Sequence, residues 1–399
     1  MSKKPVVTQT AAEEAKSLQV LREIMSGSPL RIAISVLLGF VIGSIFMAVF
    51  NQDVVDSYAT FFSAPGNTFS LAWQTIVNGY TALFNGSIIN LQGDSPVTMF
   101  RPITETLRLG APLIMAGLGV ALGFRVGLFN VGGTGQLVMG LLGATWISTR
   151  VQLPWGIHMV LALIVAVIFA SLTGALVGFL KARTGAHEVI VTIMLNYVAL
   201  DLFTFFLRQP NLLLEKNGGG NPKSDPPALT AQMPLLLGKD FNIHLGIIIA
   251  ILAAFAYWWL MERSTIGYRF RMVGHNANAA KAAGISVSRT YVWAMAASAA
   301  FIGLAAANQG LGATDGLTTS VQANIGFDAI TVALLGGSRA GGVVVAGLLF
   351  GAFKAGSPAM QITGASPEVL GIIQALIVLF VAAPPLIRAI FKLPKAEVK

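Results

Sequence analysis

Two residue patterns in this 399-residue chain come close to known catalytic motifs, and both are incomplete. His187 and Glu188 begin like the zinc-protease pattern H-E-x-x-H, but Val191 stands where the second histidine is needed. The Gly-Lys pair at 238–239 is followed by Asp240, and not by the serine or threonine of a phosphate-binding G-x-x-x-x-G-K-[ST] loop. The sequence therefore predicts neither zinc-dependent hydrolysis nor ATP hydrolysis by this chain.

The composition is that of an integral membrane protein. The chain is 55% hydrophobic and only 11% charged, with a mean hydropathy of +0.73, whereas an ordinary soluble domain is about 25% charged. Its basic residues, which give a net charge of +9, lie mainly between apolar runs. The positive-inside effect accounts for that placement, so nucleic-acid binding is not expected. Because cysteine is absent, the chain can form no disulfide and no cysteine-based metal site.

The apolar segments predict an all-α fold, a polytopic transmembrane helix bundle of about ten spans. Six segments reach the ~20 residues that cross ~30 Å of hydrocarbon, at 30–50, 157–180, 189–207, 243–261, 291–311 and 369–390. Four are shorter and are bordered or interrupted by glycine pairs, at 109–124, 136–149, 326–337 and 341–353. Short, glycine-broken helices are typical of a transport path, although a tightly packed bundle with ordinary glycine contacts is an open alternative.

Charge predicts the orientation of these spans. If all ten cross, one face receives the N-terminus and most basic groups, namely Arg125, Lys181, Arg183, the run 263–289, Arg339 and the tail from Arg388. The positive-inside rule makes that face cytoplasmic. We therefore expect a cytoplasmic segment 1–29, a transmembrane region 30–390 and a cytoplasmic tail 391–399. Within the region we expect extracytoplasmic loops at 51–105 and 209–242 and a cytoplasmic coupling segment at 262–290.

Four G-x-x-x-G pairs predict close contacts between helices. They begin at Gly39, Gly119, Gly174 and Gly347. In lipid no hydrophobic force acts between helices, and glycine lets two backbones approach closely enough to pack. The pairs therefore argue for a compact bundle.

Asp201 and Asp328 are carboxylates that fall within apolar segments, where an ion-coupled carrier would place a relay. A charge at mid-membrane costs roughly 2.5–3.5 kcal/mol, so we expect Asp201 to lie near the outer interface or to serve structure. Asp328 opens a short segment after Gly326, where a carboxylate can cap a helix N-terminus and interact favourably with the helix dipole. We favour these structural roles over a proton relay.

The stretch GYRFRMVGHNANAAKAAGISVSR, residues 267–289, carries four basic side chains and no carboxylate. Asn276 or Asn278 can cap a short alanine-rich helix, and Gly284 can take the left-handed conformation at its end. Such a helix is too polar to span a membrane, and its flat alanine face suits docking onto another protein. The alternative is an ordinary positively charged loop at the lipid surface.

This stretch resembles the cytoplasmic coupling segment of bacterial ABC-importer permeases of the branched-chain amino acid and simple-sugar superfamily. Further stretches strengthen the resemblance, namely GYTALFNGS (79–87), GLFNVGGTGQLVMG (127–140), EVIVTIMLNYVAL (188–200) and GFDAITVALLGGSRAGGVVVAGLLFGAFKAGSPAMQ (326–361). Together they look most like the nucleoside and simple-sugar branch, and the resemblance covers about residues 79–383. One departure is Thr134, where relatives commonly have glutamate.

The resemblance implies a non-catalytic permease subunit of an ABC importer, in the bacterial plasma membrane with both termini cytoplasmic. In such importers a partner ATPase binds ATP and Mg²⁺, and an extracytoplasmic lipoprotein delivers the solute. A second permease, either a sister chain or another copy, completes the path. The implied fold is that of type II importer permeases, and the implied solutes are nucleosides or simple sugars. The chain itself would bind no cofactor and no metal, and it would contact membrane lipid.

On this resemblance we assign two sets of site residues. The docking surface for the ATPase comprises Gly274, Asn276, Ala280, Ala283 and Gly284. The solute path comprises four polar side chains that can hydrogen-bond sugar hydroxyls or base edges and one ring that can stack on a base, namely Asn130, Gln136, Asn196, Tyr197 and Phe327. Each of the four polar side chains could instead form an interhelical hydrogen bond.

Two other functions stay open on the sequence alone. An ion-coupled secondary transporter would move a small polar solute without any partner ATPase. A membrane enzyme acting on lipid substrates would need a converging acid, base or metal cluster, and the sequence offers none that we recognise.

Overall fold

The computed structural model describes residues 28–215, 222–313, 315–322 and 324–382, and these residues are predominantly helical. Seven described helices are long and apolar enough to cross a membrane, and two shorter helices, Ile325–Leu335 and Glu368–Val381, are also apolar. The prediction of an all-α, polytopic membrane protein is therefore confirmed. The expected tail 391–399 and nearly all of the expected segment 1–29 lie outside the described residues.

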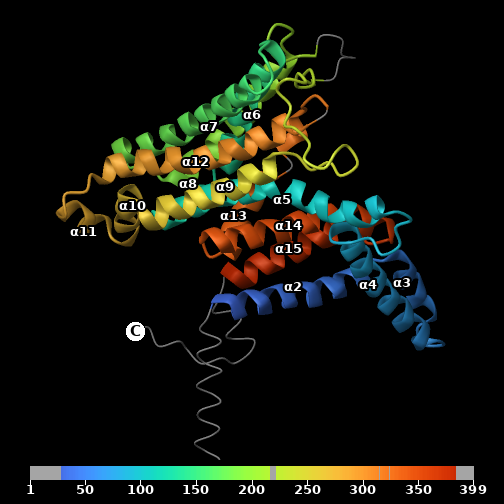
Figure 1. The fold of residues 1–399 in the computed structure, drawn as a ribbon. Helices are drawn as coiled ribbons and strands as arrows, with labels where there is room; N and C mark the ends of the chain where they lie inside the picture. Colours follow the sequence, from blue (N-terminus) through green and yellow to red (C-terminus); the bar gives the residue numbers. More distant parts are fainter. Residues whose placement is uncertain (1–27, 216–221, 314, 323, 383–399) are drawn as a thin grey trace, which may run out of the picture. The chain divides into compact units, whose positions relative to one another are not determined.

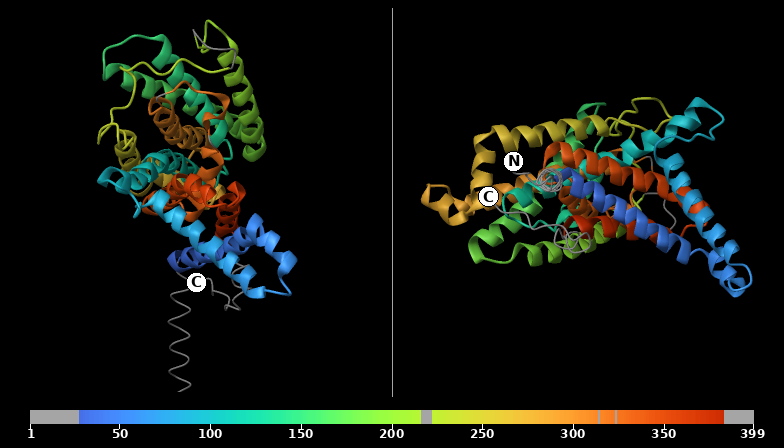
Figure 2. Two further views of the ribbon diagram at one scale, coloured as in Figure 1. Left: turned by 90° about the vertical axis from the view of Figure 1, so that its right-hand side faces the viewer. Right: turned by 90° about the horizontal axis from the view of Figure 1, so that it is seen from below.

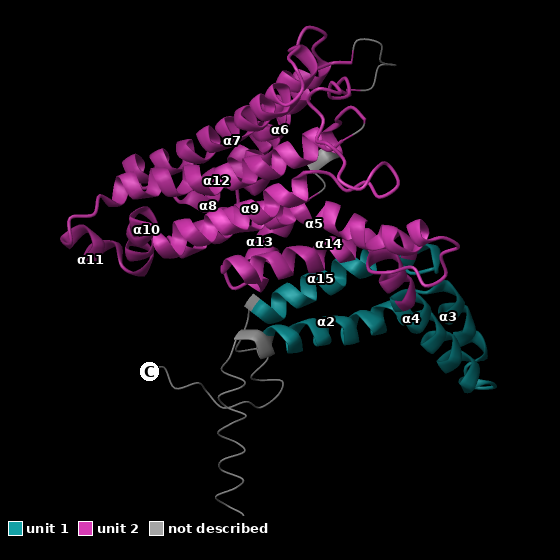
Figure 3. Ribbon diagram, in the orientation of Figure 1, with its two compact units in different colours: residues 1–80, 360–399 teal, residues 81–359 magenta. Residues whose placement is uncertain are grey.

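The chain divides into two compact units, residues 1–80 with 360–399 and residues 81–359 (Figure 3). In the first unit, α2 (Ser28–Val49) packs against α15 (Pro367–Ala382). The contact runs through Gly39 and Gly43, where a side chain would collide with isoleucines of α15. This pair is one of the predicted G-x-x-x-G contacts, and the structure shows it directly.

Residues 51–105 are not the loop that the sequence predicted. They contain α3 (Gln52–Ser57), a 3-10 turn (Tyr58–Thr60), the 23-residue helix α4 (Pro65–Ser87) and the start of α5 (Pro96–Arg125). The prediction was wrong because polar residues and glycines lower the hydropathy of α4 without preventing a helix. The start of α5 is marked by a capping box, in which the side chains of Ser95 and Thr98 bond each other's backbone N–H groups.

The second unit has a buried centre and a more exposed outer layer. The most apolar windows of α5 and α12 (Val287–Leu311) are 78% and 61% buried, against 28% for α7 (Ile157–Thr184) and 22% for α8 (Glu188–Arg208). At the centre, α6 (Gly133–Arg150) packs on α12, and α13 (Ile325–Leu335) packs on α5. The remaining elements are α9 (Gly246–Trp258) with its π-helical extension η2 (Trp259–Arg263), α10 (Thr265–His275), α11 (Ala277–Ala282), η3 (Thr319–Gln322) and most of α14 (Ala340–Ile362).

Helices α7 and α12 pack through a ridge of small residues that recurs every fourth position of α7. The ridge is buried and consists of Ala162, Ala166, Ala170, Gly174 and Gly178. A side chain at Gly174 or Gly178 would collide with backbone carbonyls of α12. Small residues at this spacing allow the close helix contact that association in lipid requires. The predicted pair at Gly174 is therefore confirmed, and it is part of a longer stripe.

The other two G-x-x-x-G pairs differ from each other. Gly347 and Gly351 of α14 lie directly against α5, where Gly351 approaches the backbone of Gly110. Gly119 likewise lies against α12, whereas Gly123 approaches the carbonyl of Leu128 in the chain just beyond α5. Three of the four pairs are thus helix contacts throughout, and the fourth is a helix contact at one glycine only.

Two of the four segments expected to be short are parts of long helices. Residues 109–124 belong to the 30-residue α5, which continues through Pro102 and Pro112, and residues 341–353 belong to the 23-residue α14. The prediction was wrong because it measured apolar runs, while a helix can continue through polar residues and proline that packing accommodates. The other two segments are short, since α6 has 18 residues and α13 has 11.

The two ends of the second unit have different character. Helices α10 and α11 lie at one end, and the irregular chain between α8 and α9 lies at the other (Figures 1 and 2). The ends of α5 and α7 carry Arg125, Lys181 and Arg183 at the α10 end, as contacts of Arg125 with η2 and of Lys181 with Tyr291 show. Of the basic groups that the sequence placed on one face, Arg125, Lys181 and Arg183 therefore lie at the same end of this unit as the run 263–289, whereas the tail from Arg388 lies outside the described residues.

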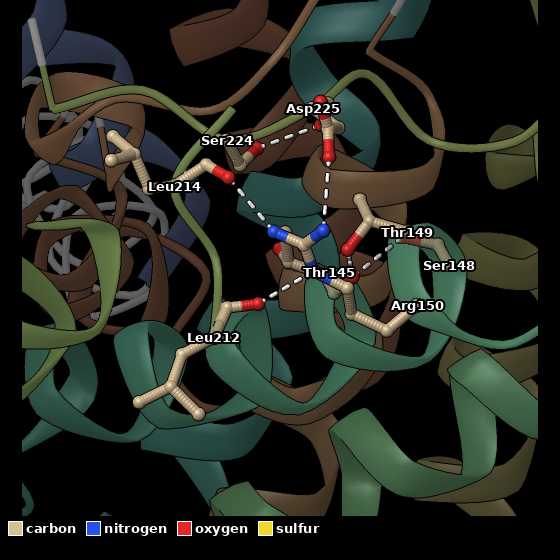
Figure 4. A network of polar contacts seen from close by, with 8 residues as sticks. All are labelled: Thr145, Ser148, Thr149, Arg150, Leu212, Leu214, Ser224 and Asp225. Carbon is tan, nitrogen blue, oxygen red and sulfur yellow. Dashed lines mark hydrogen bonds and ion pairs between the residues drawn. The ribbon is translucent and has the colours of Figure 1, made fainter. Parts of the chain in front are cut away.

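Arg150, the last residue of α6, anchors the irregular chain at the opposite end. Its guanidinium donates to the carbonyls of Leu212 (2.6 Å) and Leu214 (2.8 Å) and pairs with Asp225 (3.3 Å), as Figure 4 shows. The neighbouring Ser224 donates its backbone N–H to the carbonyl of Leu317 (2.9 Å). The described part of residues 209–245 contains no helix, and these bonds attach its residues 212–214 and 224–225 to the end of α6 and to the chain after α12.

Candidate functional site

The chain between α5 and α6, residues 126–132, contains the buried Asn130 and is called the Asn130 hairpin below. Amide side chains bond one another around Asn130. The Asn130 and Gln136 side chains bond each other twice, with N–O distances of 2.9 and 3.1 Å. Asn130 also donates to the hydroxyl of Ser298 on α12 (2.9 Å) and accepts the N–H of Gly132 (3.0 Å). Ser298 in turn donates to the carbonyl of Gly119 (2.6 Å), so one network ties α12, α5 and the first turn of α6 together.

Asn196 fastens the first turn of α6 to α8. Its side-chain oxygen accepts the N–H of Gly135 (2.7 Å), and its side-chain nitrogen donates to the carbonyl of Val131 (3.1 Å). The first N–H groups of a helix have no partner within the helix, so this amide satisfies a donor that would otherwise be buried without a bond. Asn196 therefore acts as a cap supplied by another helix.

The first turns of α6 and α13 meet at the centre of the unit. A side chain on Gly133 would collide with Gly326, and one on Gly326 would collide with the backbone of Thr134. Thr134 is buried, and its hydroxyl has no hydrogen-bond partner within the described chain. Each helix start carries partial positive charge, so two partially positive ends lie at one place. The sequence predicted the short helices but not this meeting.

The five residues assigned to the solute path therefore fall into two groups. Asn130, Gln136 and Asn196 lie close together and are buried, and their amide groups form hydrogen bonds within the chain. This geometry is that of the alternative reading, interhelical hydrogen bonding. Tyr197 and Phe327 are 63% and 54% exposed and are not part of the amide network. Sequence reasoning missed Ser298, whose only signal is a hydroxyl within a helix rich in alanine.

The coupling segment has the local structure that its sequence predicts. The side chain of Asn276 accepts the N–H groups of Asn278 and Ala279 (3.0 Å each) and so caps α11. Gly284 has a φ of 81°, the left-handed conformation expected after a helix end. Asn276 itself is extended and interrupts the helical chain, which separates α11 from α10.

Two of the five proposed docking residues pack on the chain itself. Ala280 is fully buried, and Gly274 lies against the backbone of Arg125 and Val126 at the end of α5. The assignment of Ala280 was wrong because the six-residue α11 has an inner face, which here packs on the chain itself. Gly274 belongs to α10 and is half-buried there. Asn276, Ala283 and Gly284 are exposed.

Helix α10 is held against the end of α5 by backbone contact and by charge. Glu262 of η2 forms ion pairs with Arg125 and with Arg271, the second at 3.8 Å. Gly127, with a φ of 75°, turns the chain directly beside Gly274 and leads it into the Asn130 hairpin. The coupling segment is thus in contact with the start of the hairpin that carries the amide network.

Glu188, half of the incomplete zinc motif, holds the same hairpin from the other side. One carboxylate oxygen accepts the N–H of Phe129 (3.3 Å), and the other pairs with Lys181 of α7 (2.5 Å). Glu188 is buried. Within the described residues no group of three or more histidine, aspartate or glutamate side chains could hold a metal ion.

Asp328 does not cap α13, contrary to our expectation. Asn324 occupies the cap position, and the Asp328 carboxylate pairs with Lys354 of α14 at 2.7 Å. Asp328 does lie in the first turn of α13, where a carboxylate interacts favourably with the helix dipole. The sequence did not reveal that α14 brings a lysine alongside. Asp201 is exposed on α8.

Neutralising one member of the Asp328–Lys354 pair should destabilise the protein more than neutralising both. Lys354→Met or Asp328→Asn alone leaves the opposite charge in an apolar setting, whereas the double variant leaves none. The loss should stay below the ~3–5 kcal/mol of a fully buried pair, because both side chains are partly exposed. Thermal unfolding in detergent measures it. A double variant less stable than both single variants would contradict the expectation.

A pocket of about 440 Å³ lies at the end of the unit opposite α10. Its lining includes the charged side chains of Arg108 and Asp315 and the polar side chains of Asn242 and His244. Burial, reinforced by the Arg108 charge, lowers the pKa of His244 to about 4, so its imidazole is neutral near pH 7. The pocket offers both hydrogen-bond donors and acceptors to a small polar molecule.

Comparison with known proteins places these features in one family. The family described as "Branched-chain amino acid transport system / permease component" matches residues 103–382. The chain is 40% identical to the guanosine ABC transporter permease protein NupP of Bacillus subtilis over 79% of this chain and 88% of that protein. It is 31% identical to the nucleoside ABC transporter permease protein NupB of Lactococcus lactis over 91% and 93% of the two chains.

A third relative is the glucose ABC transporter permease protein TsgB13 of Haloferax volcanii, 29% identical over 87% of this chain and 85% of that protein. No solved structure matches the chain significantly. The family match covers the central helices, the Asn130 hairpin and the coupling segment alike. The chain therefore belongs to the family of branched-chain amino acid transport system permease components.

Proposed function

We propose that this chain is the membrane-spanning permease subunit of an ABC importer for nucleosides. The observation that carries the proposal is the 40% identity to a guanosine permease, which extends over 88% of that relative. A nucleoside permease is also the relative with the widest coverage among those above, and the glucose permease is less similar than either. Simple sugars are the second candidate, because ribose hydroxyls and sugar hydroxyls call for the same hydrogen-bonding groups.

The test is uptake of radiolabelled guanosine by a bacterial strain without its own nucleoside uptake. The strain would carry this chain with its ATPase, its binding protein and a second permease. We expect uptake of guanosine that is inhibited by unlabelled nucleosides but not by glucose. An ATPase partner without activity should abolish this uptake. Uptake by this chain alone, driven by an ion gradient, would establish the secondary carrier instead.

We also propose that the second permease is a sister chain and not another copy. In Bacillus subtilis both NupP and NupQ, named guanosine ABC transporter permease proteins, match this chain, at 40% and 26% identity. In Lactococcus lactis the nucleoside permease proteins NupB and NupC match at 31% and 24%. Two unequal permeases with one transporter name in each organism support a heterodimer, in which this chain corresponds to the first.

For the mechanism, we propose that the ATPase docks on Asn276, Ala283 and Gly284 and moves α10. Because α10 contacts the end of α5, its displacement is then transmitted to the Asn130 hairpin and to the contact between the first turns of α6 and α13. Nucleotide can shift the balance between inward-open and outward-open states only if the ATPase binds the two states with different affinity. In this scheme Asn130, Gln136 and Asn196 keep the hairpin rigid, and Tyr197 and Phe327 contact the solute.

The α10 end of the unit is cytoplasmic in this proposal, because basic residues favour that side. The chain has no cysteine, so single introduced thiols report sidedness without background. Ser288→Cys at the α10 end should react with a membrane-impermeant maleimide only after the cells are opened. Leu237→Cys at the other end should react in intact cells, since Leu237 is 58% exposed. The reverse pattern would invert the orientation.

A further inference from the structure

A groove of about 1020 Å³ lies beside α11, between α10 and the start of α12. One wall comes from η2 and α10, the other from α12, and Ala283 and Gly284 after α11 close its end. The groove is separate from the Asn130 network and from the opposite pocket, since it shares no lining residue with either. The function proposed above uses only its end, where Ala283 and Gly284 belong to the proposed docking surface, and assigns no role to the space between α10 and α12.

Two arginines stand in this groove without an opposing carboxylate. Arg269 of α10 and Arg289 of α12 both line it, and no aspartate or glutamate does. Both side chains are exposed, and neither forms an ion pair with any described residue. The nearby Arg125 and Arg271, in contrast, are both paired with Glu262. The groove therefore presents two guanidinium groups that are available to an anion.

The groove turns apolar along α12. Arg289, Trp293 and Ala297 follow one another at four-residue spacing, so all three lie on one face of the helix. At 1.5 Å per residue, the face runs about 12 Å from the arginine into the membrane-crossing part of α12. Leu260 and Phe270 line the facing wall. Trp293 is 69% exposed, as is usual for an indole at the lipid–water boundary.

We propose that this groove binds an anionic phospholipid, with its phosphate between Arg269 and Arg289 and an acyl chain along Trp293 and Ala297. Guanidinium groups recognise phosphate oxygens through paired hydrogen bonds, and the hydroxyl of nearby Ser286 adds a further donor. A soluble anion would leave the apolar half of the groove unused. A basic pocket between helices on the cytoplasmic side is a recognised setting for acidic lipid headgroups.

The lipid would contact the coupling segment, because Ala283 and Gly284 line the same groove. Lipid bound there would therefore favour one position of α11 and change the coupling between ATPase and permease. The lipid site depends on the cytoplasmic placement of α10 proposed above, but not on the identity of the solute.

The test uses quenching of tryptophan fluorescence by brominated lipid. The full-length chain, with its second permease, is placed in nanodiscs of phosphatidylcholine that contain brominated phosphatidylglycerol or, in parallel, brominated phosphatidylcholine. The Trp293 signal is the difference between the native protein and Trp293→Phe. We expect phosphatidylglycerol to quench Trp293 at about 25-fold lower mole fraction than phosphatidylcholine, because the two charges contribute roughly fivefold each.

Three variants separate the site from general attraction. Arg269→Gln and Arg289→Gln should each weaken the phosphatidylglycerol preference about fivefold. Arg183→Gln removes the same charge at the same end but outside the groove, and it should leave the preference unchanged. Equal quenching by both lipids, or an unchanged preference in the two groove variants, overturns the proposal. Loss of lipid quenching when the ATPase is added also overturns it, because the groove would then belong to the protein interface.

Discussion

Replacing Ala283 with arginine is expected to release the ATPase and to lower ATP-driven uptake by about tenfold or more. Ala283 is exposed beside α11, in a segment that already carries Lys281 and Arg289. A buried, unpaired charge at an interface costs about 2–5 kcal/mol, and like charges nearby add to that cost. Co-purification of the ATPase with the permease, and uptake in the strain described above, measure the two effects.

The matched control is Ser288→Arg, which adds the same side chain at an exposed position at the start of α12. This variant should retain the ATPase. Both variants should have the same unfolding temperature as the native protein, because neither position is buried. Retention of the ATPase by Ala283→Arg would move the docking surface away from α11. Ala280 is unsuitable for this test, since an arginine there would replace a fully buried methyl group and disturb the fold.

Replacing Gly274 with valine is expected to separate docking from transport. The new side chain would collide with the backbone of Arg125 and Val126, which no change of rotamer can relieve. Overpacking of this kind typically costs 1–3 kcal/mol, so α10 should shift away from α5 while α11 keeps its own cap. We expect the ATPase still to co-purify, with uptake reduced about five- to a hundredfold, the range of typical coupling energies.

Gly341→Val is the control for this variant, because a side chain at Gly341 meets no atom within 4 Å. It carries the same glycine-to-valine change on a helix of the same unit. Normal uptake by Gly274→Val would show that the α10–α5 contact does not transmit the motion. Loss of both docking and uptake would show instead that Gly274 supports the segment as a whole.

Three amide side chains assigned to the solute path have another role in the structure. Asn130, Gln136 and Asn196 were chosen for the solute path because their chemistry suits hydroxyls and base edges. The structure uses the same chemistry to bond the chain to itself. Nothing in the residue types distinguishes the two uses, because an amide offers the same donors and acceptors to a solute and to a neighbouring helix.

Local sequence determined a large share of this protein. Hydropathy determined that it spans a membrane, and Asn276 and Gly284 predicted the ends of α11. These features depend on nearest neighbours along the chain, where propensity and capping operate. The spacing of small residues in α7 likewise predicted a close contact between helices.

Only the tertiary structure decided which elements meet. That Asp328 pairs with Lys354, that Glu188 holds the Asn130 hairpin, and that Ala280 faces inward all depend on residues far apart in sequence. The start of α6 meets the start of α13 through two glycines nearly two hundred positions apart, for the same reason. Such contacts are selected by packing and by the need to satisfy buried polar groups, and both are properties of the assembled helices.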